Sequence, residues 1–164
     1  MKKLKSPTQA KLTPLSVFIY NFGLKAAGWD MGDRIAMPKA DFYIDARGLP
    51  DGAMNAPGVS GDDPIQQEWL KAEMAKQGIH LSTYVRLALD AIYAIPHRRR
   101  QMTDPYTKPF IIACFCAYGL NRSRGLKNLL APELQAQLNE LMIDREAFVK
   151  TLWGIPGLQV RAKS

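Results

Sequence analysis

Apolar residues along the chain fall into compact runs separated by turn residues, and the period within each segment indicates its secondary structure. Compact apolar runs predict strands over 15–22, 42–44 and 110–115. The last run is the most continuous, as expected for a strand that is buried on both faces of a sheet. Apolar residues at spacings of three and four predict helices over 64–77, 82–95, 128–141 and 144–153.

Capping residues set the expected helix boundaries. Pro64 suits a first helical turn and Gly78 suits a stop, while Ser82 and Asp144 can cap the helices that follow them. Pro132 should interrupt the helical stretch in which it lies. Strands separated by helices predict an α/β fold with a mixed or mostly parallel sheet flanked by helices.

Length and composition indicate one ordinary globular domain. The chain has 164 residues, of which 47% are hydrophobic and 23% charged, which excludes a disordered or collagen-like protein. We expect a single domain with a basic N-terminal segment at 1–14 and a C-terminal helical extension at 132–164. The loop over 48–64 is rich in Gly, Pro, Asn and Asp, and a loop of this length in a compact domain is usually functional or mobile.

The lengths of the apolar runs bear on membrane contact, and the two cysteines bear on the cellular location of the protein. No apolar run approaches the roughly 20 residues that span a bilayer, so we expect no membrane partner. Cys114 and Cys116 are too close in sequence for ordinary disulfide geometry, which favours a reducing, cytoplasmic location.

Charge is divided unevenly along the chain, although its total is +7. Residues 41–80 include seven acidic and three basic side chains, whereas residues 86–127 include eight basic and two acidic ones. This division predicts an anionic partner for the second half. Solvated helix faces of opposite sign are the alternative interpretation.

The segment with the clearest chemical content follows the third predicted strand. It consists of Cys116, Ala117, Tyr118, Gly119, Leu120, Asn121, Arg122 and Ser123. A strand that leads through a glycine-containing loop into a helix directs backbone N–H groups and a helix dipole at one point, which suits an anion. Arg122 can close over a phosphate with its planar fork, and Ser123 can bond the Cys116 sulfur or a phosphate oxygen.

The Cys-x5-Arg-Ser spacing is that of the protein tyrosine phosphatase loop, in which the cysteine is the nucleophile. Catalysis is nevertheless not favoured. Tyr118 and Leu120 crowd the loop, and Phe115 stands where that signature often has His. A general acid could come from several carboxylates, and nothing in the sequence singles out one of Asp45, Asp51, Asp62, Asp63 and Asp104. The alternative is that Cys116, like Cys114, is a small buried apolar residue.

Three segments, taken in order, resemble the C-terminal domain of the RNase adapter protein RapZ. The family's Ser-Phe-Gly-Phe-Lys is matched by Asn-Phe-Gly-Leu-Lys at 21–25. Its Phe-Asp-x-Arg-x-Leu-Pro-Asn-Pro is matched by Ile-Asp-Ala-Arg-Gly-Leu-Pro-Asp-Gly at 44–52. Its Gly-Cys-Thr-Gly-Gly-x-His-Arg-Ser is matched by Phe-Cys-Ala-Tyr-Gly-Leu-Asn-Arg-Ser at 115–123.

The resemblance implies an α/β fold with one anion pocket that senses glucosamine-6-phosphate and lies near surfaces that bind small RNA. Carried over, the pocket comprises Arg47, Cys116, Gly119, Arg122 and Ser123, with Lys25 and Asn121 beside them. The period of a strand independently places Asp45 and Arg47 on one side, where one can orient the other; a surface ion pair is the alternative. Ala117, Tyr118 and Asn121 depart from the family pattern, so the ligand can differ from the amino sugar. The family's kinase-like domain is absent from this chain, and so is a Walker-type phosphate loop.

Three classes of function remain. The first is a module that binds a phosphorylated small molecule or a nucleotide, with RNA as an additional candidate partner; the second is a cysteine phosphatase; the third is an interaction protein that acts through its basic face. Tyr118, in a loop expected to be exposed, could stack on a base as easily as pack on a neighbouring side chain. Four arginines could follow a nucleic-acid backbone: Arg98, Arg99, Arg100 and Arg124. Nothing in the sequence indicates a metal or a cofactor, and homo-oligomerisation is left open.

Overall fold

The computed structural model of the protein describes residues 12–25, 37–51, 63–118 and 121–152. Its elements follow the order β1 (Leu15–Gly23), β2 (Phe42–Asp45), α1 (Pro64–Lys76), α2 (Leu81–Tyr93), α3 (Ile95–Arg98), β3 (Phe110–Cys116), α4 (Arg122–Leu141) and β4 (Ala147–Thr151). The four strands form one sheet in the order β2-β3-β1-β4, and every neighbouring pair is parallel. The expected α/β class, with a parallel sheet and helices, is confirmed.

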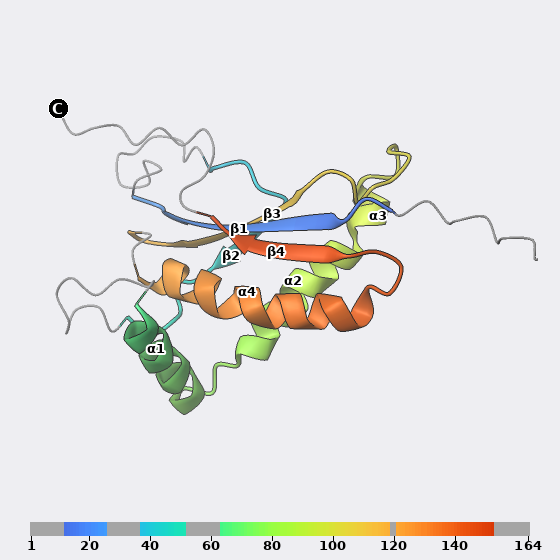
Figure 1. Ribbon diagram of the computed structural model, residues 1–164. Helices are drawn as coiled ribbons and strands as arrows, with labels where there is room; N and C mark the ends of the chain where they lie inside the picture. The colour runs from blue at the N-terminus through green and yellow to red at the C-terminus, as the bar shows by residue number, and fades with distance from the viewer. Residues whose placement is uncertain (1–11, 26–36, 52–62, 119–120, 153–164) are drawn as a thin grey trace, which may run out of the picture.

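Helices α1, α2 and α4 lie on one side of the sheet (Figure 1). In the core between the helices and the sheet, buried residues recur at regular intervals along α4 and along the strands that face it. Along α4, every fourth residue is fully buried at Leu126, Leu130, Leu134 and Leu138. Alternate residues of the central strands, such as Ile112 and Cys114 of β3, face the same core.

The apolar strand runs and two helix boundaries agree with the sequence predictions. β1, β2 and β3 each extend one residue beyond the predicted run. Pro64 lies in the first turn of α1, and Asp63 caps this helix by accepting a hydrogen bond from the Ile65 N–H at 2.8 Å. Gly78 follows the helix with a φ of 69°, a left-handed conformation that suits glycine. Ser82, expected as a cap, lies inside the first turn of α2, whose N-cap residue is His80.

The helical prediction for the C-terminal part was partly wrong. α4 continues through Pro132 without interruption, because the proline ring lies on the exposed side while the buried leucines of α4 pack on the sheet. That packing offsets a cost of about 3 kcal/mol for an interior proline.

Residues 144–153 were predicted to be a helix capped by Asp144, but Ala147–Thr151 form β4. Pairing with β1, from Leu15 opposite Ala147 to Ile19 opposite Thr151, supplies the backbone partners that local sequence cannot reveal. The proposed helical extension at 132–164 is therefore wrong at 147–151. The remainder at 153–164 lies outside the described residues, as does most of the basic segment at 1–14.

Because all four strands are parallel, their carboxyl ends meet at one edge of the sheet. Gly23, Asp45, Cys116 and Thr151 end their strands there, and α4 begins at the same edge (Figure 1). Ligand sites of α/β sheets typically lie at this edge. No helix in the described parts of the chain is long and apolar enough to cross a membrane.

Candidate functional site

Backbone hydrogen bonds hold three predicted site segments together at the carboxyl edge. The Leu24 and Lys25 N–H groups donate to the carbonyl oxygens of Cys116 and Ala117, at 2.9 and 3.0 Å. On the other side of β3, the Ala46 N–H donates to the Phe115 carbonyl at 2.8 Å. The segments that start from Lys25, Asp45 and Cys116 therefore lie side by side.

Cys116 and Ser123 make one of the two contacts that the sequence predicted for Ser123. Cys116 ends β3 and is 3% exposed, and Ser123, in the first turn of α4, is fully buried. The thiol donates to the Ser123 hydroxyl oxygen with a sulfur–oxygen distance of 3.2 Å. This bond ties the end of the strand to the start of the helix, so the intervening loop has both ends fixed.

The residues in the first turn of α4 contribute positive charge only. The N-cap residue is Asn121, whose side chain makes no capping hydrogen bond, and the first turn has no acidic side chain. Arg122 and Arg124 both lie in this turn, next to the positive end of the dipole of a 20-residue helix. Cations are unfavourable at this end of a helix and anions are favourable, by roughly 0.3–1 kcal/mol each. The local electrostatics therefore favour a bound anion.

Arg122 reaches from α4 to the segment that follows β2. Its guanidinium donates to the Arg47 carbonyl oxygen. Its Nε atom lies 3.8 Å from a carboxylate oxygen of Asp51. The Arg122 side chain is 19% exposed.

Asp45 and Arg47 form the expected pair. The Asp45 carboxylate accepts from Arg47 Nε at 3.0 Å, from a terminal guanidinium nitrogen at 2.8 Å and from the Arg47 backbone N–H at 2.9 Å. Hydrogen bonds from Arg47 hold the pKa of Asp45 below its usual value, against the opposing effect of desolvation. Both side chains are about half-exposed, so the pair is also a surface ion pair. The Arg47 guanidinium lies 5.6 Å from the centre of the Phe115 ring.

Lys25 and Tyr118 form a second contact at this edge. The Lys25 ammonium donates to the Tyr118 hydroxyl at 2.6 Å and lies 4.2 Å from the centre of its ring. Tyr118 is 62% exposed, so the ring is available to a ligand. The predicted residues Gly119 and Leu120 lie outside the described residues.

The structure separates the predicted nucleic-acid-binding arginines. Arg124 lies at the carboxyl edge, whereas Arg98 donates to the Asp41 carbonyl at the start of β2. Arg99 donates to the carbonyl oxygens of Pro105, Lys108 and Pro109 at 3.0, 2.6 and 3.0 Å. Its side chain is only 10% exposed. Arg99 thus holds the loop before β3, at the opposite edge of the sheet, while Arg100 is exposed there.

The carboxylates considered as general acids are also distributed unequally. Two of them lie near Arg122. Asp51 is the carboxylate 3.8 Å from its Nε atom, and the charge of Arg122 contributes to lowering the pKa of Asp45. Asp63 caps α1. Asp104 bonds Arg145 at 3.1 Å, which together with a backbone bond from Tyr106 lowers its pKa, and Asp62 lies outside the described residues.

Sequence reasoning missed a buried polar pair beneath this edge. Lys127 is 2% exposed, and its ammonium donates to the Asn21 side-chain oxygen at 2.8 Å and to the Leu152 carbonyl at 3.3 Å. Burial raises the pKa of the nearby Cys114 thiol to about 12, and the Lys127 charge opposes that rise. A lysine and an asparagine inside apolar segments were the available signal. Among the described residues, no group of three or more His, Cys, Asp or Glu side chains could hold a metal ion.

Comparison of the chain with protein-family models and with curated proteins finds no match. The resemblance to the RapZ C-terminal domain therefore stays a prediction, based on the three segments that the sheet aligns at its carboxyl edge.

Proposed function

We propose that the protein is an anion-binding module that recognises a phosphorylated small molecule or a nucleotide at the carboxyl edge of its sheet. The observation that carries this proposal is the start of α4, where two arginines and the helix dipole meet without an acidic side chain in the first turn. A phosphate here would accept hydrogen bonds from Arg122, Arg47 and the helix N–H groups, beside the Asp51 and Asp45 carboxylates that the two arginines already contact.

The surroundings favour a phosphate ester over a free anion. Tyr118 offers an exposed aromatic face beside the Lys25 ammonium. A base or sugar ring attached to the phosphate can stack on this face.

The two buried cysteines are free thiols, which supports a cytoplasmic setting.

The proposal is tested by calorimetric titration of inorganic phosphate and of mononucleotides into the wild type and Arg122→Lys. The substitution keeps the charge but removes the planar fork, which is worth about 1.5–3 kcal/mol in a charged hydrogen-bonded contact. We expect affinity to fall roughly 10- to 100-fold. Arg100→Lys, at the opposite edge, is the matched control and should bind like the wild type. Equal affinity in all three proteins, or no binding to the wild type, would contradict the proposal.

Cysteine phosphatase activity is the second candidate, favoured by the thiol–hydroxyl bond between Cys116 and Ser123. In that reaction the thiolate attacks phosphorus, and the leaving oxygen takes a proton from an acid. Burial of Cys116 argues against efficient turnover. The assay compares hydrolysis of para-nitrophenyl phosphate by the wild type and by Cys116→Ser. We expect little hydrolysis by either protein. Turnover by the wild type that disappears in the variant would establish the phosphatase activity.

RNA is the additional partner that we propose to test at the same edge. Tyr118 and Arg124 support it because they combine a stacking face with a cation. Binding of RNA by a site of this kind should weaken steeply with salt. An interaction protein that acts through its basic face would instead bind a partner independently of Arg122.

A further inference from the structure

β4 is an edge strand of the sheet: it pairs with β1 on one side, and no described strand pairs with its outer side. The Glu146 carbonyl accepts from Leu15 N–H at 2.9 Å, and Leu152 N–H donates to the Ile19 carbonyl at 3.0 Å. In a parallel pair, the backbone groups of successive residues point to opposite sides of the strand. Ala147 and Val149 therefore turn their N–H and C=O groups outward, away from β1. Such an edge is a template for another strand.

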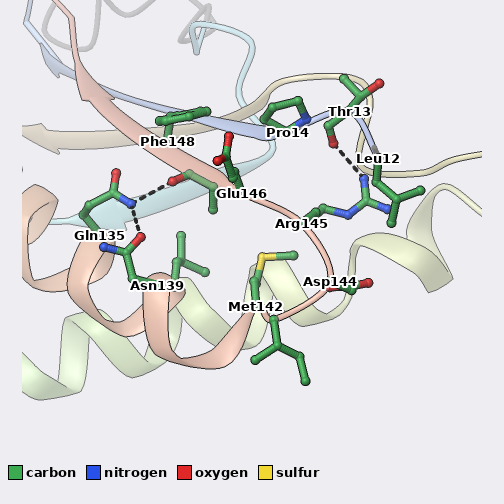
Figure 2. Close-up of a pocket in the computed structure, with 13 residues that line it drawn as sticks. Leu12, Thr13, Pro14, Gln135, Asn139, Met142, Asp144, Arg145, Glu146 and Phe148 are labelled. Carbon is green, nitrogen blue, oxygen red and sulfur yellow. Dashed lines mark hydrogen bonds between the residues drawn. The ribbon is translucent and has the colours of Figure 1, made fainter. Parts of the chain in front are cut away.

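The Gln135 side chain on α4 covers part of this edge. Its amide nitrogen donates to the Ala147 carbonyl at 2.7 Å, and its amide oxygen accepts from the Val149 N–H at 2.7 Å. Figure 2 shows the amide against the strand, with a further bond of 2.9 Å to Asn139. A carboxamide has the same donor and acceptor as a peptide group. The Gln135 amide thus satisfies one outward C=O group and one outward N–H group of β4, as the backbone of a neighbouring strand would.

The exposed side chains of β4 are complementary to those of an identical strand in antiparallel orientation. If Phe148 lies opposite Phe148 of a second copy, Ala147 lies opposite Val149, and the outward backbone groups of these two residues form a hydrogen-bonded pair. The same register places Glu146 opposite Lys150, twice by symmetry. Both charges are exposed, and Phe148 is 46% exposed on the same side of the strand. Opposite charges and aromatic pairs at directly facing positions stabilise a sheet.

We propose that the protein dimerises with a second copy of itself through antiparallel pairing of β4. In the monomer, the Gln135 amide occupies backbone groups of β4 that this pairing would use. Gln135 satisfies Ala147 C=O and Val149 N–H, two of the four backbone groups that the second copy would satisfy. The four hydrogen bonds of the pairing would replace the four that the two Gln135 amides make in two monomers. Pairing therefore exchanges bonds rather than adding them, which makes the dimer weak and concentration-dependent. Gln135 also lines hollows of about 810 and 510 Å³ on the two sides of its contact, so the side chain has room to turn aside.

Cysteine cross-linking tests the register directly. Facing residues at a non-hydrogen-bonded position have Cα atoms about 4.5 Å apart, within disulfide range. Phe148→Cys should therefore form a disulfide-linked dimer under mild oxidation. Lys150→Cys is the matched control, because its own copies would lie four residues apart, about 13 Å along the strands. The native Cys114 and Cys116 are 0% and 3% exposed and should stay reduced. No cross-link at position 148, or equal cross-linking at both positions, overturns the proposal.

Sedimentation velocity over a concentration series measures the dimer dissociation constant and tests whether Gln135 competes with dimerisation. Gln135→Ala removes the competing amide, so we expect the dimer dissociation constant to fall at least tenfold. Gln137→Ala on the same helix, which lines a different hollow beside α2, should leave the constant unchanged. Glu146→Lys should weaken the dimer, and the double swap with Lys150→Glu should restore it. Weaker or unchanged association of folded Gln135→Ala, or failure of the double swap, overturns the proposal.

Discussion

The arginine run at 98–100 offers a sharp test, because adjacent residues have opposite roles in the structure. Arg99→Ala removes a guanidinium that donates to three carbonyl oxygens, those of Pro105, Lys108 and Pro109. The same group lies 3.5 Å from the Asp41 carboxylate, which also accepts from the Ile111 N–H at 2.8 Å. The substitution should therefore loosen both the loop before β3 and the start of β2.

The magnitude follows from these contacts. A hydrogen bond from a charged donor is worth about 1.5–3 kcal/mol when both partners are held, and solvent can replace part of it at the exposed carbonyls. Breaking a buried ion pair costs about 3–5 kcal/mol because it leaves an unpaired buried charge, and here the carboxylate left behind, Asp41, is 30% exposed. We expect the lower limit, about 3 kcal/mol, for Arg99→Ala. With a urea m-value of about 2–3 kcal/mol/M, the unfolding midpoint should fall by roughly 1–1.5 M.

Urea unfolding followed by circular dichroism measures this effect, and Arg100→Ala is the control. Arg100 is exposed, so its removal should change the free energy of unfolding by less than about 0.5 kcal/mol. Equal, small effects of both substitutions would refute the structural role assigned to Arg99. They would also restore the interpretation of the whole run as a solvated, nucleic-acid-binding surface.

Three further predictions concern single residues. At pH 8.5, iodoacetamide should leave Cys114 of the folded protein unmodified, because burial raises its pKa to about 12; mass spectrometry after digestion would reveal any faster reaction than at Cys116. Asp45→Asn should be less stable than the wild type near neutral pH, by at most about 1 kcal/mol for this half-exposed pair. Since the folded Asp45 carboxyl has a pKa below its usual 3.8, this difference should disappear as the pH falls below that value in a series of urea titrations, and a constant difference would contradict the ion pair. Gly125→Ala should lower stability by about 1 kcal/mol, because the added Cβ would lie 2.7 Å from Leu70 Cδ2 and overpacking outweighs the helix-propensity gain; an increased melting temperature would disprove that contact.

The parts of the fold that the sequence predicts correctly are those encoded by local pattern. Strands β1 and β3 are continuous apolar runs, and α1 has a proline at its start and a glycine after its end. β4 differs because only Ala147 of its five residues is buried. Its polar and exposed positions resemble a helix face, and only pairing with β1 determines its conformation.

The candidate site shows the same division between local and distant determinants. The contacts of Cys116 with Ser123 and of Asp45 with Arg47 depend on spacings of seven and two residues, and the sequence predicted both. The approach of Arg122 to Asp51 and the burial of Arg99 depend on segments brought together by the sheet. A count of charges along residues 86–127 cannot distinguish an arginine that holds a loop from one that faces solvent.

The separation of basic residues between the two edges constrains the size of any shared ligand. Arg122 and Arg124 begin α4 at the carboxyl edge, whereas Arg98 and Arg100 lie near the amino end of β3. β3 has seven residues, which extend over about 23 Å. A sugar phosphate or mononucleotide is too short to contact both edges, so its affinity should depend on Arg122 and not on Arg100. Only a polymer such as RNA could reach both, and its affinity would then fall with either substitution. Comparison of the two variants against a mononucleotide and an RNA therefore separates a small-molecule site from a nucleic-acid surface.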